Sequence, residues 1–164
     1  MRISQDGVDL VKHFESCALV AYPDPKTKAD PWTVGWGATG KDIERGTHWT
    51  QYQADQRLEN DLLERERQVS AAVTIPLTQW QFDAMVSIVF NVGSGSTKRD
   101  GILRLKAGGP STLLRKLNAG DIQGASAEFI RWISPGSAVE NGLRRRRVAE
   151  TALFNGKDWR KAIA

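Results

Sequence analysis

Three side chains near the N-terminus are of types that could cleave a glycosidic bond. Glu15 lies on or beside the apolar stripe of an expected helix, Asp24 follows nine residues later in a loop, and Thr33 begins a strand-like stretch. Keeping a carboxyl group partly out of water favours its protonated form, which a general acid needs. Glycoside hydrolysis combines such an acid with a second carboxylate across the bond. Glu15 is therefore a candidate proton donor, Asp24 a candidate partner, and Thr33 a candidate holder of water.

Each of these residues also has an ordinary structural explanation. A glutamate at a helix end is more often a surface ion-pair residue, an aspartate between prolines is usually a turn former, and threonine is a good strand residue. The loop between Asp24 and Thr33 also contains Asp30, which competes for the role of second carboxylate. Residue types and spacing alone leave both the chemistry and the second carboxylate open.

The elements expected around these residues form a small lobe with one helix and a hairpin. Apolar periodicity predicts a helix over about 4–16. Residues 32–37 alternate with a period of two, and with residues 18–22 they predict the hairpin. The strand face that carries Thr33 is otherwise made of glycine, so a ligand could approach the backbone closely there.

The remaining residues predict a connecting helix and a helical lobe. Two capping boxes, Thr50 with Gln53 and Thr78 with Gln81, mark the starts of a long charged helix and of an apolar core helix. Shorter helices are expected over 111–118, 121–133 and 141–154. The predicted fold class is α+β, with two lobes in one domain, 1–164. Its expected parts are a small lobe over about 14–50, a linking helix over about 51–73, and a helical lobe over about 78–164 on which the first helix packs.

Composition excludes several kinds of site. The length of 164 residues suits one ordinary domain with a core of its own. Cys17 is the only cysteine, and His13 and His48 are the only histidines, so we expect neither a disulfide nor a Cys- or His-rich metal centre. No apolar run is long enough to span a membrane, and the first residues lack the apolar core of a signal peptide. We therefore expect synthesis in the cytoplasm without a classical export signal.

The net charge of +4 is unevenly distributed along the chain. Residues 1–97 hold 9 basic and 13 acidic side chains, whereas residues 98–164 hold 14 and 6. The basic half predicts an anionic partner, which could be nucleic acid, a membrane surface or an acidic polymer. The run Arg144–Arg147 points around most of a helical turn, so we expect a solvated helix with one or two arginines that cap carbonyls or pair with Glu140 and Glu150. No nucleic-acid motif accompanies it.

The order and context of these residues resemble the phage-type lysozymes, the endolysins of glycoside hydrolase family 24. The catalytic signature of that family is a Glu, an Asp about nine residues later, and a Thr that begins a Thr-hydrophobic-Gly-x-Gly strand. The strand is followed here by Ala38, where many members have histidine. The segments that carry the resemblance are Phe14-Glu15, Ala21–Asp24, Pro31–Gly37, Phe90–Gly93, Ser111–Asp121, Trp132, Gly142–Arg147 and Glu150.

The resemblance implies a muramidase that hydrolyses the β-1,4 bond between N-acetylmuramic acid and N-acetylglucosamine in peptidoglycan, with no metal or cofactor. Glu15 would be the general acid, Asp24 the second carboxylate, and Thr33 the residue that positions the attacking water. Thr39 and Phe90 would line the cleft and bind substrate. The family implies inversion at the anomeric carbon, and the separation of the two carboxyl groups would test inversion against retention.

Two other functions stay open. A lytic transglycosylase would use Glu15 alone and release anhydro sugars, and a wall-binding domain would bind peptidoglycan without cleaving it. We also expect a monomer that binds no nucleic acid, does not insert stably into a membrane, and waits in the host cytoplasm until a holin gives it access to the wall. A virion-associated enzyme is the alternative to that route.

Overall fold

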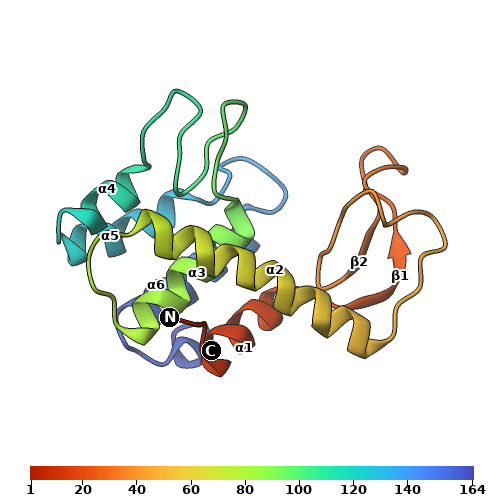
Figure 1. Cartoon of the computed structure of the whole chain (residues 1–164), viewed down its shortest axis with the longest axis horizontal. Coiled ribbons are helices and arrows are strands. Elements are labelled where there is room, and N and C mark those ends of the chain that lie inside the picture. Colours follow the sequence, from red (N-terminus) through yellow and green to blue (C-terminus); the bar gives the residue numbers. More distant parts are fainter. The chain divides into compact units, whose positions relative to one another are not determined.

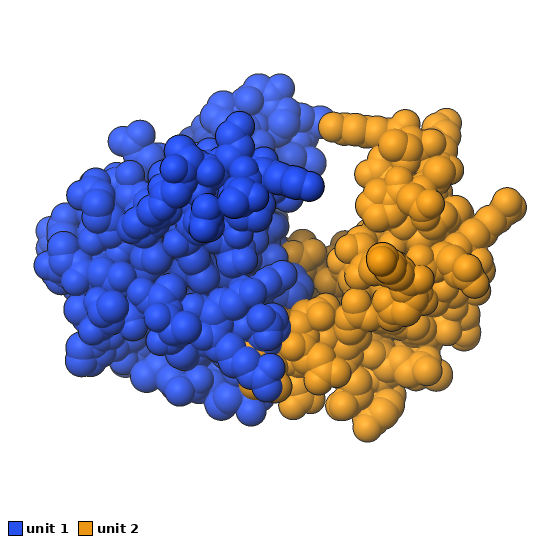
Figure 2. All heavy atoms as spheres, turned by 45° about the horizontal axis from the view of Figure 1, so that its top comes forward, with its two compact units in different colours: residues 1–10, 64–164 blue, residues 11–63 orange.

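Seven α-helices and one short antiparallel hairpin make up the chain, whose computed structural model describes all 164 residues (Figure 1). The predicted mostly helical α+β class is confirmed. The chain divides into two units (Figure 2). Unit 1 comprises Met1–Leu10 and Glu64–Ala164, and unit 2 comprises Val11–Leu63. Helices α1 (Gln5–Phe14) and α2 (Gln51–Ala72) each begin in one unit and end in the other.

Unit 2 is built around the predicted hairpin. Strand β1 (Ala18–Tyr22) pairs with β2 (Thr33–Gly35), and Tyr22 lies opposite Thr33. Its small core consists of four buried apolar residues against which two tryptophans pack. These residues are Ala21, Val34, Ala38 and Ile43, with Trp32 and Trp49 around them.

Strand β2 ends earlier than the alternation over 32–37 predicts. Gly35 and Gly37 have φ angles of +64° and +87°, which lie in the left-handed region that favours glycine. The chain therefore leaves the extended conformation after Gly35. As a result, the shared strand face ends at Val34, and Trp36 lies in the turn that follows.

Helix α2 begins at the predicted capping box. The backbone N–H of Thr50 donates to Gln53 Oε1 at 2.8 Å, and the N–H of Gln53 donates to Thr50 Oγ1 at 3.1 Å. The helix ends at Ala72, one residue before the predicted end. A narrow row of side chains along it is buried, which matches its sparse apolar stripe. These side chains are Ala54, Leu58, Leu62, Glu66 and Val69.

Unit 1 is helical and packs around α3 (Gln79–Val92), whose residues Phe82–Val89 are all buried. This helix begins at the predicted capping box of Thr78 and Gln81. Helix α3 packs mainly against α6 (Glu140–Phe154). The other elements are α4 (Thr112–Asn118), α5 (Ile122–Glu128), a 3-10 turn (Phe129–Arg131) and α7 (Trp159–Ala162). Across the chain, no helix combines the length and the apolar character needed to cross a membrane.

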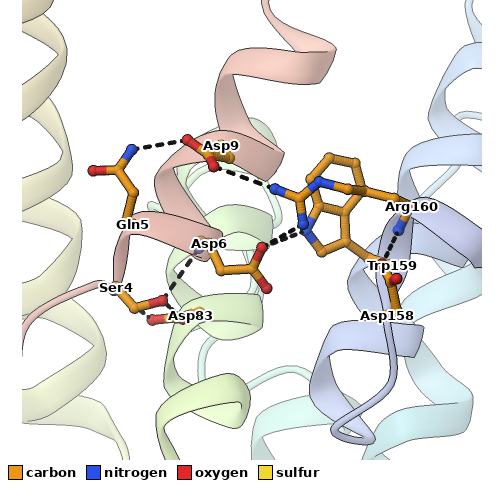
Figure 3. Close-up of polar contacts among 9 residues, drawn as sticks. Ser4, Gln5, Asp6, Asp9, Asp83, Asp158, Trp159 and Arg160 are labelled. Atoms are coloured by element: carbon orange, nitrogen blue, oxygen red, sulfur yellow. Dashed lines mark hydrogen bonds and ion pairs between the residues drawn. The ribbon is translucent and has the colours of Figure 1, made fainter.

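The two ends of the chain are tied together within unit 1 (Figure 3). Arg160 of α7 pairs with Asp6 at 2.5 Å and with Asp9 at 3.2 Å. Trp159 is buried, and its indole N–H donates to Asp6 at 3.2 Å. Buried Asp83 of α3 accepts the backbone N–H that precedes α1 at 2.9 Å. The basic C-terminal segment is therefore packed into the fold and holds the start of α1.

Candidate active site

Glu15 lies directly after α1, in unit 2, with its side chain partly buried. Its backbone N–H donates to the carbonyl of Val11 at 3.0 Å, which continues the last helical turn. The carboxylate lies against Gly37, because a Cβ atom added to that glycine would stand 3.2 Å from Glu15 Oε2. Gly37 lies in the turn after β2 and not on the predicted strand face, and its lack of a side chain lets the backbone approach this carboxylate closely.

Asp24 lies in the turn between the two strands, and that turn is closed by its own atoms. Its Oδ1 accepts the backbone N–H groups of Lys26 at 2.8 Å and Thr27 at 2.9 Å. Its backbone N–H donates to the carbonyl of Ala29 at 3.0 Å. The hydrogen bonds from Thr27 and Lys26 lower the pKa of Asp24, because they stabilise the charged form. Asp24 is thus a turn former and also a carboxylate that stays ionised at neutral pH.

Thr33 and Asp30 lie at the other end of this turn. Thr33 is the first residue of β2 and is partly exposed. Asp30 is exposed, and its backbone carbonyl accepts the hydroxyl of Thr27 at 2.9 Å. The turn therefore fixes the backbone around Asp30. The carboxylate of Asp30 accepts no hydrogen bond in the structure, whereas that of Asp24 accepts two from backbone amides.

Thr39 lies in the loop after β2 and is exposed. Its carbonyl accepts a hydrogen bond from Arg57 Nη2 at 3.0 Å. Arg57 also pairs with Asp42 at 3.0 Å and with Asp61 at 3.2 Å, and the attraction of these carboxylates raises its pKa against the opposing effect of burial. One arginine of α2 thus fixes the loop that carries Thr39. Sequence inspection did not single out this residue.

Phe90 lies near the end of α3, in unit 1, and is partly buried. The next two residues of the chain line a groove of about 570 Å³ within the same unit. The groove combines apolar side chains, one indole ring and a few polar groups, as small-molecule sites commonly do. Its lining residues are Asn91, Val92, Arg99, Asp100, Trp132, Ser134, Val139 and Leu143.

Four of the five predicted site residues, Glu15, Asp24, Thr33 and Thr39, thus belong to unit 2 and its hairpin, and Phe90 belongs to unit 1. No group of three or more His, Cys, Asp or Glu side chains could hold a metal ion. Unit 2 therefore carries a partly buried carboxyl group, that of Glu15, and an ionised one, that of Asp24. Such a pair could cleave a glycosidic bond, because the reaction needs a proton donor and a nearby carboxylate.

Comparisons with known proteins agree on one family. The phage lysozyme family matches residues 12–150. The endolysin of Acyrthosiphon pisum secondary endosymbiont phage 1 is 39% identical, over 94% of this chain and 98% of that protein. The endolysin of Bacillus phage B103 is 38% identical over 94% of this chain, which spans only 54% of that longer protein. Some other similar proteins, such as that of Enterobacteria phage P21 at 34% identity, are named SAR-endolysins.

A solved structure gives the same result. The muramidase domain of SpmX from Asticaccaulis excentricus superimposes with a TM-score of 0.75 at 34% identity. The match covers 93% of this chain and 97% of that domain. Both the sequence and the arrangement of elements are therefore shared over nearly the whole chain.

Proposed function

We propose a reaction and residue roles for this chain on the premise that it belongs to the phage lysozyme family, and so is an endolysin-type glycoside hydrolase that degrades peptidoglycan. The bond cleaved is the β-1,4 bond between N-acetylmuramic acid and N-acetylglucosamine. The observation that carries the proposal is the contact of the Glu15 carboxylate with Gly37, in the unit whose hairpin turn holds ionised Asp24.

Glu15 donates its proton to the bridging oxygen, and the bond from that oxygen to the anomeric carbon breaks. Positive charge develops on the sugar as the bond breaks, and the anionic form of Asp24 stabilises it. A water molecule held by the Thr33 hydroxyl adds to the anomeric carbon while Asp24 takes its proton. Exchange with solvent then returns both carboxyl groups to their starting forms. These reaction steps invert the configuration at the anomeric carbon.

Thr39 and Phe90 each bind the glycan substrate. The fixed carbonyl of Thr39 supports this role, because Arg57 holds the loop in place before substrate arrives. The partly exposed ring of Phe90 offers an apolar surface to the face of a sugar. Neither role requires a metal or cofactor.

The reaction is tested by incubating the protein with cells whose outer membrane has been removed. We expect the turbidity to fall and mass spectrometry to show reducing-end fragments that have gained one water molecule. Anhydro fragments would identify a lytic transglycosylase instead. Sedimentation of the protein with peptidoglycan without any fall in turbidity would identify a binding domain.

The change Gly37→Ala should displace the Glu15 carboxylate. The added methyl group would stand 3.2 Å from Oε2, and a residue with a side chain is strained at a φ of +87° by about 1–2 kcal/mol. We expect the rate of wall hydrolysis to fall by about tenfold or more, because small displacements of catalytic groups have large effects.

The matched control for that change is Gly46→Ala in the same unit. Gly46 has a φ of +85°, and nothing lies within 4 Å of its added Cβ atom. Urea denaturation should show a similar loss of stability in both variants, whereas turbidity assays should show the loss of activity only for Gly37→Ala. Equal activity losses would mean that strain alone is responsible.

The pH dependence of the rate should show the lowered pKa of Asp24. Activity needs its anion, so the rate falls as the pH drops through that pKa. Because the backbone N–H groups of Thr27 and Lys26 lower the pKa, the acid limb of the pH–rate profile should lie below the ordinary range of an aspartate. Asp24→Asn should remove most of the activity, while Asp30→Asn should leave the rate and the acid limb unchanged. The reverse result would assign the second carboxylate to Asp30.

The enzyme acts on the host cell wall. We propose that it waits in the host cytoplasm as a monomer, binds peptidoglycan and not nucleic acid, and is released by a holin. Fractionation of expressing cells should recover it from the cytoplasm until a holin is co-expressed. Membrane-bound protein that lyses cells unaided would instead indicate the route of a SAR-endolysin.

A further inference from the structure

We propose that Trp36, held by Asp55 and Lys12, is a positioning residue that fixes the turn carrying Gly37 against the Glu15 carboxylate. The inference rests on the proposed role of Glu15 as proton donor. It adds three residues to the machinery of the reaction, none of which is expected to touch the reacting atoms.

The side chain of Trp36 is held by two charged groups on different elements. Its indole N–H donates to Asp55 Oδ1 of α2 at 2.8 Å. The ammonium group of Lys12, on α1, lies 5.1 Å from the centroid of the indole ring and 3.4 Å from Asp55 Oδ1. Gln51 donates to the same oxygen at 3.1 Å. Three donors therefore converge on one carboxylate oxygen, and Asp55 and Lys12 together hold the ring.

The Asp55 carboxylate remains charged within this cluster. The hydrogen bond from Trp36 is the main cause of its lowered pKa, and Gln51 and Lys12 add to the effect. A hydrogen bond to an ionised acceptor is about twice as strong as one between neutral groups. The hydrogen bond from Trp36 to Asp55, the tether of the indole ring, is therefore stronger than one between neutral groups. It persists over the neutral and mildly acidic pH range.

Trp36 occupies the middle of the turn that meets Glu15. The turn is closed at its base by two backbone hydrogen bonds between Val34 and Ala38, of 3.0 and 2.9 Å. Between them, Gly35 and Gly37 provide no side chain to hold the turn, so the indole of Trp36 is the one side chain that can anchor it. Lys12 is three residues before Glu15 on the same helical segment. The cluster thus links the segment that carries the carboxylate to the backbone that lies against it.

This arrangement contributes little to the hairpin core. Trp32 and Trp49 pack against that core, and Trp36 does not belong to it. The side chains of Lys12 and Asp55 are 32% and 40% exposed, and ion pairs at such positions stabilise a fold only slightly. The main effect of the cluster is therefore on the geometry of the turn.

The test measures kcat and KM on solubilised glycan strands for Trp36→Phe, Asp55→Ala and the double variant. Trp36→Phe keeps a ring beneath Lys12 and removes the N–H donor. We expect kcat to fall about tenfold with KM within about twofold of the wild type, because binding is unchanged and alignment is lost. The double variant should be no worse than Asp55→Ala alone, because both changes remove the same tether. Asp55→Asn keeps the acceptor oxygen and should retain kcat to within about threefold.

Two controls separate positioning from stability. Trp32→Phe makes the same substitution in the hairpin core, and Glu59→Gln removes one negative charge from an exposed position of α2. We expect both to keep the wild-type kcat, although Trp32→Phe should lower the melting temperature. A wild-type kcat in Trp36→Phe, or additive losses in the double variant, would overturn the proposal. Activity in Glu15→Gln would instead overturn the proposed function, so the two failures are distinguishable.

Discussion

The variant Glu15→Gln should lose wall hydrolysis by about a thousandfold or more while it keeps its fold. Glutamine has nearly the shape of glutamate, and it has no acidic proton to give to the glycosidic oxygen. General acid catalysis contributes about 10²–10⁴-fold to such reactions. The variant should still bind peptidoglycan, because the substitution leaves the partly buried side chain in contact with Gly37.

A matched glutamate in the same unit provides the control. Glu44 is exposed, and Glu44→Gln makes the same chemical change at a position outside the proposed machinery. Turbidity assays should show wild-type clearing by Glu44→Gln and none by Glu15→Gln, while circular dichroism and urea denaturation show both to be folded. Clearing at the wild-type rate by Glu15→Gln would contradict the proposed mechanism.

Local signals in the sequence predicted the order and the approximate positions of the main helices and of the hairpin. The capping boxes at Thr50 and Thr78 involve residues three apart, so they can be recognised without knowledge of the tertiary structure. The sequence predicted that a ligand could approach a bare strand face that includes Gly37, but Gly37 lies in the turn after that strand and meets a side chain of the chain itself. The sequence could not show that the group approaching it is Glu15, since that contact depends on how the helix end meets the hairpin.

The turn after β2 shows what a period of two misses. Alternation placed Trp36 on the same face as Val34, but the left-handed conformations of Gly35 and Gly37 end the strand between them. Glycine allows such a conformation without requiring it, so the pattern alone favoured a longer strand. The partner of Trp36, Asp55, is 19 residues away, and nothing in the local pattern indicates that pairing.

The arginine run is the largest correction to the sequence analysis. Arg144 pairs with Glu140 at 3.0 Å on the surface, as predicted. Arg146 and Arg147 are 3% and 0% exposed, so they lie in the core of unit 1 and not on a solvated helix. The predicted pairing with Glu150 is confirmed, because both arginines contact its carboxylate and their spacings of four and three residues place them on the same helix face. Buried arginines are rare, which is why the solvated interpretation was favoured. The basic half therefore presents fewer charges to a polymer than its composition suggests.

Glu150 is the centre of this buried network. Its carboxylate pairs with Arg146 Nε at 3.1 Å and with Arg147 Nη1 at 2.8 Å, and it accepts the Ser87 hydroxyl at 2.7 Å. Arg147 also donates to the side-chain oxygen of Asn91 at the end of α3. Burial lowers the pKa of Arg147, and the attraction of Glu150 counteracts this by favouring the charged form. The carboxylate therefore holds α6 to α3, and it compensates the positive charges of the two buried arginines.

The variant Glu150→Gln should accordingly lower the free energy of unfolding by about 3–5 kcal/mol, because it removes the carboxylate that both buried arginines share. For a chain of this length the melting temperature should fall on the order of 10 °C. Glu140→Gln on the same helix breaks the exposed pair with Arg144 and should cost about 1 kcal/mol or less. Ser87→Ala removes one hydrogen bond of the carboxylate and should fall between the two, at about 1–3 kcal/mol. Thermal and urea denaturation measure all three. If Glu150→Gln were no less stable than Glu140→Gln, the buried network would not be a main stabiliser of unit 1, and the contact between α3 and α6 would depend on its apolar side chains alone.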